Sequence, residues 1–449
     1  MSALIDWDLC NTLNRSLKRR IHELYLNNIR DGIKLAQNKI YDPVLSILFM
    51  KKKSYRDLKF SVEEYLCILN NLIINYFKDQ KIQDYFAFSE IEKQLIFSLS
   101  DARIDICRFD GYISSKNGSL KILEHNADSP AGTFFTSIIN DTYKKHVEDQ
   151  LDTALNIEDL PIDSKFCFIN ALLHAYSLRG KVKKPNFLIL QVNGKSNKES
   201  NELASYLNLN GYVSWVADPS ELEFNDQVSY KGNIVDLIWN KINIDMWRME
   251  FQNEPPWITK LIEAIRKGKI CHVNPFSARY IVENKLSLSI LHEEFYQKYL
   301  NQEERSIINS LLPWAAKFEK KKIVNYSGKW QEMEKLVKDN QNLWVVKKHY
   351  DIRGEGVFIG QFLSKMEWDD IVKEAFENGY LLQEYIKPLV FPTLKDDSIV
   401  ERELNFSLDC FMFNGKLQGF GSKVSAHHKV NIFQGGAKMA VLVRGENDS

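Results

Sequence analysis

The sequence has no excess charge of either sign, since 59 lysine and arginine residues balance 59 aspartate and glutamate residues. A neutral chain produces no long-range field toward nucleic acid or an anionic membrane surface, so we expect neither as a partner. Apolar runs such as residues 43–50 are far too short to span a bilayer. The first residues carry Asp6 and Asp8 and no basic segment followed by an apolar stretch, so we expect no secretory signal peptide.

Cysteine is also scarce, and its spacing argues against the usual cysteine-based sites. The 449 residues include six cysteines without a C-x-x-C pair, which predicts that most of the thiols are buried core residues in a reducing, cytoplasmic compartment. The nine histidines show no metal-ligand spacing, and the sequence has no internal repeat or low-complexity tract. No Ser-His or Cys-His arrangement indicates a covalent nucleophile.

The most informative stretch that is present is a predicted β-hairpin. Residues 103–113 and 119–126 each alternate polar and apolar side chains, which is the period of a half-buried strand. Asn117 and Gly118, between them, suit the positive φ angles of a tight turn. Because alternate side chains of a strand share one face, this pairing would gather the polar side chains of both strands.

Four polar residues would then share one face of the hairpin, namely Arg108, Asp110, Glu124 and Asn126. Two carboxylates, an amide oxygen and a guanidinium in one patch suit a magnesium ion that carries a nucleotide phosphate. The next segment, residues 128–133, is predicted to be a turn that opens a helix, where free backbone N–H groups hold an anion. If this pattern is considered alone, the alternative is a surface hairpin whose polar face is exposed to water.

The whole chain predicts an α/β fold of the α+β type. Helical periodicity is found in the first hundred residues, for example at 17–36 and 61–77. Short strands at 186–192, 211–216 and 234–239, with a helix between the first two, predict a small parallel βαβ subdomain, and no G-x-G-x-x-G supports dinucleotide binding there. We expect four parts: an N-terminal helical region (1–100), the metal-binding hairpin with its following helices (101–180), the βαβ substrate-side subdomain (181–275), and a lid and nucleotide-binding part (276–443).

The last part combines predicted helices with antiparallel strands. Helices are predicted at 277–294, which carries Lys285, and at 302–341. The strand 343–348 then runs into a loop, residues 351–356, whose glycines let backbone amides approach a phosphate because no Cβ intervenes. A plain hairpin turn is the alternative for this loop. Further strands are predicted at 381–386, 403–413 and 417–424, followed by a glycine-terminated loop at 431–436.

In chain order, the motifs are R-x-D, E-x-N-x-D-S-P-A-G, N-K, V-V-K with a Gly/Arg loop, L-L-Q-E-Y-I and N-x-x-x-G-G. Over about residues 101–443 this set resembles the circularly permuted ATP-grasp ligases, a family that includes glutathionylspermidine synthetase. In ordinary ATP-grasp enzymes the E-x-N motif follows the lysines, whereas here Glu124 and Asn126 precede them. A permuted chain keeps the same site because catalysis depends on spatial placement. The resemblance implies a circularly permuted ATP-grasp fold that uses ATP and Mg²⁺.

The resemblance also implies a role for each matching residue. The magnesium ligands would be Asp110, Glu124 and Asn126. The catalytic residues would be Arg108, Lys347, Arg353 and Lys423. ATP would contact Lys285, Lys347, Gly354, Gly356, Gln383, Glu384, Ile386 and Asn431. The acceptor substrate would lie near Ser129, Gly132 and Thr133.

Two departures from the family stand out. The segment between Lys285 and Lys347 is longer than in glutathionylspermidine synthetase, and Lys423 stands where relatives often carry arginine, so the charge is kept without the planar fork. The first hundred residues also lack the pattern of the Cys/His amidase domain found in the bifunctional relative.

The implied reaction joins a carboxylate and an amine into an amide through an acyl phosphate, with release of ADP and phosphate. The substrates would be small-molecule, peptide or carrier-bound carboxylates and amines, and a homodimer is the prior for the assembly. Two alternatives stay open: an ATP-binding module without catalysis, and a small-molecule kinase that stops after phosphoryl transfer.

Overall fold

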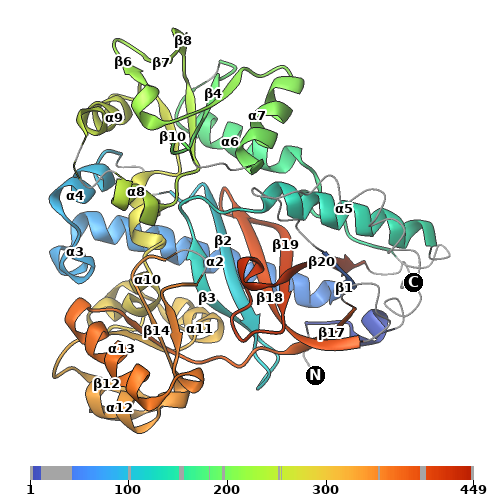
Figure 1. The fold of residues 1–449 in the computed structure, drawn as a ribbon, viewed down its shortest axis with the longest axis vertical. Helices are drawn as coiled ribbons and strands as arrows, with labels where there is room; N and C mark the ends of the chain where they lie inside the picture. Colours follow the sequence, from blue (N-terminus) through green and yellow to red (C-terminus); the bar gives the residue numbers. More distant parts are fainter. Residues whose placement is uncertain are drawn as a thin grey trace.

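A central sheet of seven strands organises the molecule (Figure 1). The structure is a computed structural model that describes residues 4–11, 43–99, 103–150, 156–181, 183–194, 198–250, 253, 255–351, 354–394 and 401–445. The strand order is β1-β20-β19-β18-β2-β3, with β17 paired to β18, and all pairs are antiparallel except β1 with β20. The strands are β1 (Pro43–Lys51), β2 (Ile106–Ile113), β3 (Leu120–Asn126), β17 (Val390–Leu394), β18 (Glu401–Phe413), β19 (Lys416–Ser425) and β20 (Ala437–Arg444).

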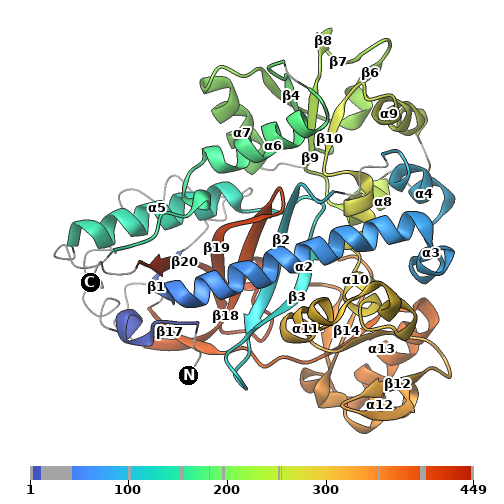
Figure 2. The same cartoon turned by 180° about the vertical axis from the view of Figure 1, so that it is seen from behind.

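One long helix covers the back of this sheet, as Figure 2 shows. This helix, α2 (Lys52–Lys78), buries side chains three and four positions apart, including Leu58, Val62, Tyr65 and Leu69, which is the apolar stripe of an amphipathic helix. Two short helices follow it, α3 (Gln80–Phe86) and α4 (Glu90–Ile96). The opposite face of the sheet is covered near β20 by α5 (Thr133–Gln150).

A parallel sheet forms the upper part of the molecule in Figure 1 and confirms the predicted βαβ unit. Its order is β10-β9-β4-β5, and every neighbouring pair is parallel. The strands are β4 (Phe187–Leu190), β5 (Ser214–Ala217), β9 (Leu237–Asn240) and β10 (Cys271–Val273), with α6 (Phe166–Leu178), α7 (Lys198–Leu209), α8 (Ile244–Glu250) and α9 (Pro256–Arg266). A small antiparallel extension contains β6 (Glu223–Phe224), β7 (Val228–Tyr230) and β8 (Asn233–Ile234).

A third part, at the lower left of Figure 1, has its own apolar core around the buried rings of Trp344 and Trp368. Its sheet has the order β11-β16-β14-β15. The strands are β11 (Ala315–Lys317), β14 (Trp344–Lys347), β15 (Val357–Ile359) and β16 (Leu381–Glu384), with a separate hairpin of β12 (Ile323–Tyr326) and β13 (Lys329–Glu332). The helices are α10 (Leu286–Ile290), α11 (Gln302–Leu311), α12 (Met333–Asp339) and α13 (Lys365–Asn378).

Three of the predicted helices need correction or lie outside the described residues. The prediction at 17–36 falls outside them, and the described residues 43–51 of the N-terminal region form strand β1. The prediction at 302–341 holds for α11 and α12 and is wrong between them, because Pro313 restricts the backbone before it and a tight turn at 327–328 with positive φ angles makes a hairpin. The prediction at 277–294 breaks into a π-helical turn (Ala278–Val282) and α10.

Residues 7–11 are also helical, and the other described helices are short 3₁₀ turns. They lie at Pro161–Asp163, Pro219–Glu221, Glu294–Tyr299, Gln341–Leu343, Gly360–Phe362 and Ile432–Gln434. Of the helices in the described ranges, none combines the length and the apolar composition that a membrane crossing would need.

Candidate functional site

The hairpin formed by β2 and β3 has the register that the sequence predicts. Asp110 pairs with Glu124, and Arg108 pairs with Asn126. Directly paired residues of an antiparallel hairpin point to the same face, so all four polar side chains lie together. They face away from α2, toward the third part of the molecule, and therefore form one wall of a cleft.

A bulge in β3 shapes this wall. The register shifts after Asp110, so that Gly111 pairs with Ile122 and Leu123 is left as the extra residue. Its carbonyl oxygen accepts a hydrogen bond from Lys347 Nζ at 2.7 Å. The bulge therefore joins the hairpin to β14 of the third part.

Gly111→Ala is expected to disturb this junction. An ideal Cβ at residue 111 would lie 2.6 Å from Lys121 O and 2.8 Å from Leu120 Cδ1, and the first of these is backbone that cannot move away freely. We expect a loss of about 1–3 kcal/mol in the free energy of unfolding, typical of overpacking, measured by urea titration. An unchanged midpoint would show that β3 accommodates the methyl group without strain.

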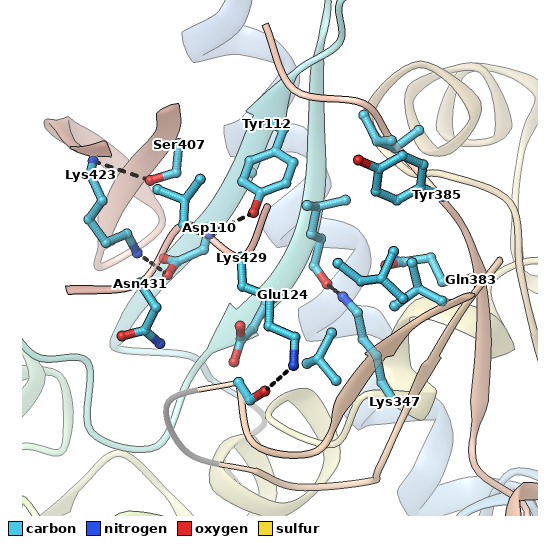
Figure 3. Close-up of a pocket in the computed structure, with 18 of the residues that line it drawn as sticks. Asp110, Tyr112, Glu124, Lys347, Gln383, Tyr385, Ser407, Lys423, Lys429 and Asn431 are labelled. Carbon is cyan, nitrogen blue, oxygen red and sulfur yellow. Dashed lines mark hydrogen bonds and ion pairs between the residues drawn. The ribbon is translucent and has the colours of Figure 1, made fainter. Parts of the chain in front are cut away.

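The second wall of the cleft comes from β14, β15 and β16 (Figure 3). Lys347 and Gln383 point into the cleft from this side, while Asp110 and Lys423 face them from the central sheet, with Glu124 between. The empty space amounts to about 810 Å³. The lining residues include Asp110, Tyr112, Glu124, Lys347, Gly354, Gln383, Glu384, Ile386, Lys423, Lys429 and Asn431.

The loop between β19 and β20 closes one end of the cleft. Lys429 Nζ donates a hydrogen bond to Gly354 O at 3.2 Å, and Val430 N donates to the Tyr112 hydroxyl at 3.2 Å. The ring of Phe362 stacks on His428 at 3.8 Å between centroids. This loop of the central sheet therefore touches the third part at two places.

A row of charged side chains crosses the central sheet. Lys438 on β20 pairs with Lys423 on β19, and Asp409 on β18 pairs with Asp110 on β2. Asp409 Oδ2 lies 3.1 Å from Lys423 Nζ and 3.8 Å from Lys438 Nζ. Sequence reasoning missed Asp409 and Lys438, although the alternation along 403–413 already placed Asp409 on one face of a strand.

Asp110 is held by two cations at once. Arg108 Nε and Nη2 donate to its two oxygens at 2.6 and 2.9 Å, and Lys423 Nζ donates to Oδ2 at 2.7 Å. Burial would raise the pKa of Asp110, but Arg108 and Lys423 hold it well below its ordinary value. Asp110 is therefore a carboxylate at neutral pH.

Glu124 forms an ion pair with Lys285. Lys285 Nζ lies 2.7 Å from Glu124 Oε1 and 3.8 Å from Asp351 Oδ1. Burial would raise the pKa of Glu124, yet Lys285 lowers it below its ordinary value. Burial would likewise lower the pKa of Lys285, while Glu124 and Asp351 raise it, so both members of the pair stay charged.

In two other buried lysines, the attraction of nearby carboxylates does not offset the effect of burial on the pKa. Burial lowers the pKa of Lys347 to about 8, with Glu124 opposing the shift and Lys285 adding to it. Burial also lowers the pKa of Lys438 to about 8, against the attraction of Asp409. A bound anion would stabilise the charged form of both lysines, because its negative charge offsets the cost of burying the ammonium group.

The oxygen donors of Asp110, Glu124 and Asn126 are chemically suited to magnesium. Asn126 Nδ2 donates to Arg108 O at 3.4 Å, so the amide oxygen is the atom left for a metal ion. Within the described ranges, no set of three histidine, cysteine, aspartate or glutamate side chains is arranged to hold a metal ion. The predicted ligand set is not such a cluster, because only Asp110 and Glu124 belong to these residue types and Asn126 contributes an amide oxygen.

The turn before α5 departs from its predicted role as an open anion site. Gly132 N donates to both carboxylate oxygens of Glu199 at 2.9 and 3.1 Å, and Lys241 Nζ lies 3.2 Å from Glu199 Oε2. The amides of residues 127 and 128 donate to Glu283. Carboxylates of the protein itself therefore occupy the N–H groups near Ser129 and Gly132, while Thr133 begins the helix.

The other predicted residues divide into three groups. Gly354, Gln383, Glu384, Ile386 and Asn431 line the cleft. Lys285 reaches the site through Glu124, and Gly356 N donates to Asp351 Oδ2 at 3.1 Å beside it. Arg353 lies outside the described residues.

Comparison with family models and with curated proteins gave no match to this chain. Among solved structures, the chain is similar to a glutathione synthetase-like effector (GSS30) from Globodera pallida in its apo form. The TM-score is 0.60 and the identity 12%, over 97% of each chain. A similarity at this identity concerns the fold, which is therefore a mixed α/β fold shared with a glutathione synthetase-like protein.

Proposed function

We propose that this chain is an ATP-dependent carboxylate–amine ligase with a circularly permuted ATP-grasp fold. The observation that carries the proposal is the convergence of two distant hairpins on one cleft. Asp110 and Glu124 line it from the central sheet, and Lys347 and Gly354 line it from the third part, more than two hundred residues later. The fold shared with a glutathione synthetase-like protein supports the same class of reaction.

The nucleotide would occupy the side of the cleft next to β14 and β16. Gln383 is 1% exposed, and among the described residues its Nε2 finds no hydrogen-bond partner, so an adenine ring nitrogen would satisfy it. Glu384, whose Oε1 accepts from the Tyr326 hydroxyl at 3.3 Å, would accept hydrogen bonds from the ribose hydroxyls. Lys347 and Lys285 would hold the phosphates, because both are buried cations beside Glu124.

The acceptor would occupy a second hollow of about 620 Å³ that opens into the first. The two share Asp110, Glu124 and Lys423, and the second adds Arg108 and Lys438 among its lining residues. Burial lowers the pKa of Lys438 on this wall, so a substrate carboxylate nearby would stabilise its charged form. Arg108 would donate to that carboxylate at the boundary between the two hollows.

The proposed reaction has two steps. A carboxylate oxygen of the acceptor attacks the γ-phosphorus, and the bond to ADP breaks. The amine nitrogen next attacks the acyl carbon, phosphate leaves, and the amine proton passes to solvent. The side chains of this protein position the reactants and neutralise charge, which is the main contribution in phosphoryl transfer. Asp110, Glu124 and Asn126 would hold Mg²⁺, whose positive charge would help to neutralise the nucleotide phosphates.

Trapping with hydroxylamine tests this proposal. The purified chain, MgATP and a panel of amino acids, peptides and other carboxylates are incubated with hydroxylamine in place of the amine. We expect equal amounts of ADP and an acyl hydroxamate, which requires an activated acyl group. A stable phosphorylated alcohol would instead indicate a kinase, and MgATP binding in calorimetry without turnover would indicate a binding module.

The affinity for MgATP is expected to fall as the pH rises through 8. A phosphate needs the charged form of Lys347, whose pKa burial lowers to about 8 in the free protein. The charged fraction of such a group falls from about 0.9 at pH 7 to about 0.1 at pH 9, so the affinity should fall about ten-fold. Calorimetry should also detect proton uptake on binding at pH 8. Lys347→Arg should flatten the profile, and a flat profile in the unsubstituted protein would remove Lys347 from the phosphate site.

A further inference from the structure

One histidine lies between the two predicted metal ligands of β3 and points the other way. Because neighbouring side chains of a strand alternate, His125 faces the back of the sheet while Glu124 and Asn126 face the cleft. His125 is 1% exposed and lies under α2. Its Nε2 is 2.8 Å from the hydroxyl of Tyr65.

The other ring nitrogen contacts the segment that leads into α10. His125 Nδ1 lies 2.9 Å from Ser287 Oγ and 3.3 Å from Val282 O. Ser287 Oγ itself donates to Val282 O at 2.9 Å, so Ser287 Oγ is left as an acceptor for Nδ1–H. The hydrogen bonding thus assigns the proton to Nδ1, and Nε2 accepts from Tyr65.

The same segment carries the lysine of the site. Lys285 is two residues before Ser287, and its Nζ lies 2.7 Å from Glu124 Oε1. β3 therefore holds residues 285–287 from both of its faces, through Glu124 on the cleft side and through His125 on the back. A lysine side chain has a flexible four-carbon stem, so the position of its ammonium depends on how firmly its backbone is held.

We propose that His125 is a positioning residue that anchors residues 285–287, so that the ammonium of Lys285 is presented to Glu124 and to the phosphates of a bound nucleotide. The proposal rests on the proposed function only for the identity of the ligand. The anchoring contact itself is present without any ligand. Removing a group that orients a metal-binding side chain typically costs about 10–100-fold in metal affinity or activity, and we expect a loss of the same order for the orientation of Lys285.

Three single variants separate positioning from a general loss of stability. Ser287→Ala removes the partner of Nδ1, on the side of Lys285, whereas Tyr65→Phe removes the partner of Nε2, on the side of α2. We expect Ser287→Ala and His125→Phe to weaken MgATP binding by about 10-fold or more in calorimetry. Tyr65→Phe should lower the melting temperature but leave the affinity within about two-fold, which makes it the matched control. Equal losses of affinity in Tyr65→Phe and Ser287→Ala would overturn the proposal.

A double-mutant cycle tests in the absence of nucleotide whether His125 anchors residues 285–287. If His125 positions Lys285, the shifts in melting temperature caused by His125→Phe and Lys285→Met should be non-additive, because they act on one connected set of contacts. Additive shifts would overturn the proposal. If the unsubstituted chain fails to bind MgATP, the proposed function fails, and the cycle still decides whether His125 anchors Lys285. If MgATP binds but no hydroxamate forms, the result rejects the proposed ligase reaction but not the anchoring role of His125.

Discussion

Glu124→Gln is expected to lower the rate of ADP formation by roughly 10²–10³-fold, as losses of single electrostatic contacts to a reacting group do. Glu124 lies between the two walls of the cleft, opposite Asp110 in the hairpin and 2.7 Å from Lys285. The amide keeps the size of the side chain but removes the charge that would hold a magnesium ion. It also leaves Lys285 with Asp351, at 3.8 Å, as its nearest described carboxylate. Both changes should weaken the binding of the phosphates and leave the adenine side of the cleft unchanged.

The measurement combines ADP release with calorimetry in the presence and absence of Mg²⁺. In the unsubstituted protein Mg²⁺ should strengthen nucleotide binding, and in Glu124→Gln this gain should disappear. Glu403→Gln is the matched control, because Glu403 is exposed on β18 of the same sheet and the substitution is chemically identical. It should behave as the unsubstituted protein. A Glu124→Gln rate above a tenth of normal would place Glu124 away from the reacting phosphates.

Arg279→Met is expected to be among the most destabilising single substitutions in the chain, by about 3–5 kcal/mol, because its loss leaves buried hydrogen-bond acceptors unsatisfied. Arg279 is 0% exposed, and Nη1 donates to the carbonyls of Asp128 and Asn240 at 2.6 and 2.9 Å. Nη2 donates to the carbonyl of Ile242. Methionine fills much of the space but leaves three buried acceptors unsatisfied, each of which costs about 1–3 kcal/mol. The guanidinium thus ties the turn before α5 to the end of β9.

Urea titration followed by circular dichroism measures this loss. Arg266→Met is the control, because Arg266 is exposed in the last turn of α9, and surface substitutions usually change stability by less than about 0.5 kcal/mol. Equal midpoints for the two variants would mean that water replaces the guanidinium of Arg279 at the three carbonyls.

Local patterns were sufficient for the parts of the site that lie on single hairpins. Period-two alternation with an Asn-Gly turn predicted which face of β2 and β3 would carry Arg108, Asp110, Glu124 and Asn126, and the register agrees. The same reasoning located the β14–β15 hairpin with Lys347 at its edge. It failed in the middle of 302–341, where three strands lie between the helices α11 and α12, because a turn of positive φ and Pro313 outweigh weak helix propensity.

Contacts between strands distant in sequence could not be predicted in this way. Asp409 and Lys438 join the site because β18 pairs with β2 and β19 pairs with β20, and no local pattern specifies which strands become neighbours. Glu199, on a helix of the parallel part, reaches Gly132 for the same reason. The partners of His125 likewise come from segments 60 and 162 residues away.

Within each hairpin the amino-acid sequence was enough to define the local geometry, since strand periodicity, turn residues and glycine positions act over a few neighbours. It thereby set which face of each hairpin is polar and placed a carboxylate pair opposite each other on β2 and β3. The three-dimensional arrangement was needed to see that this pair and Lys347 share a cleft, and which cations hold each carboxylate. Burial and the pairing of distant strands bring these charges together, and both depend on how the whole apolar core packs.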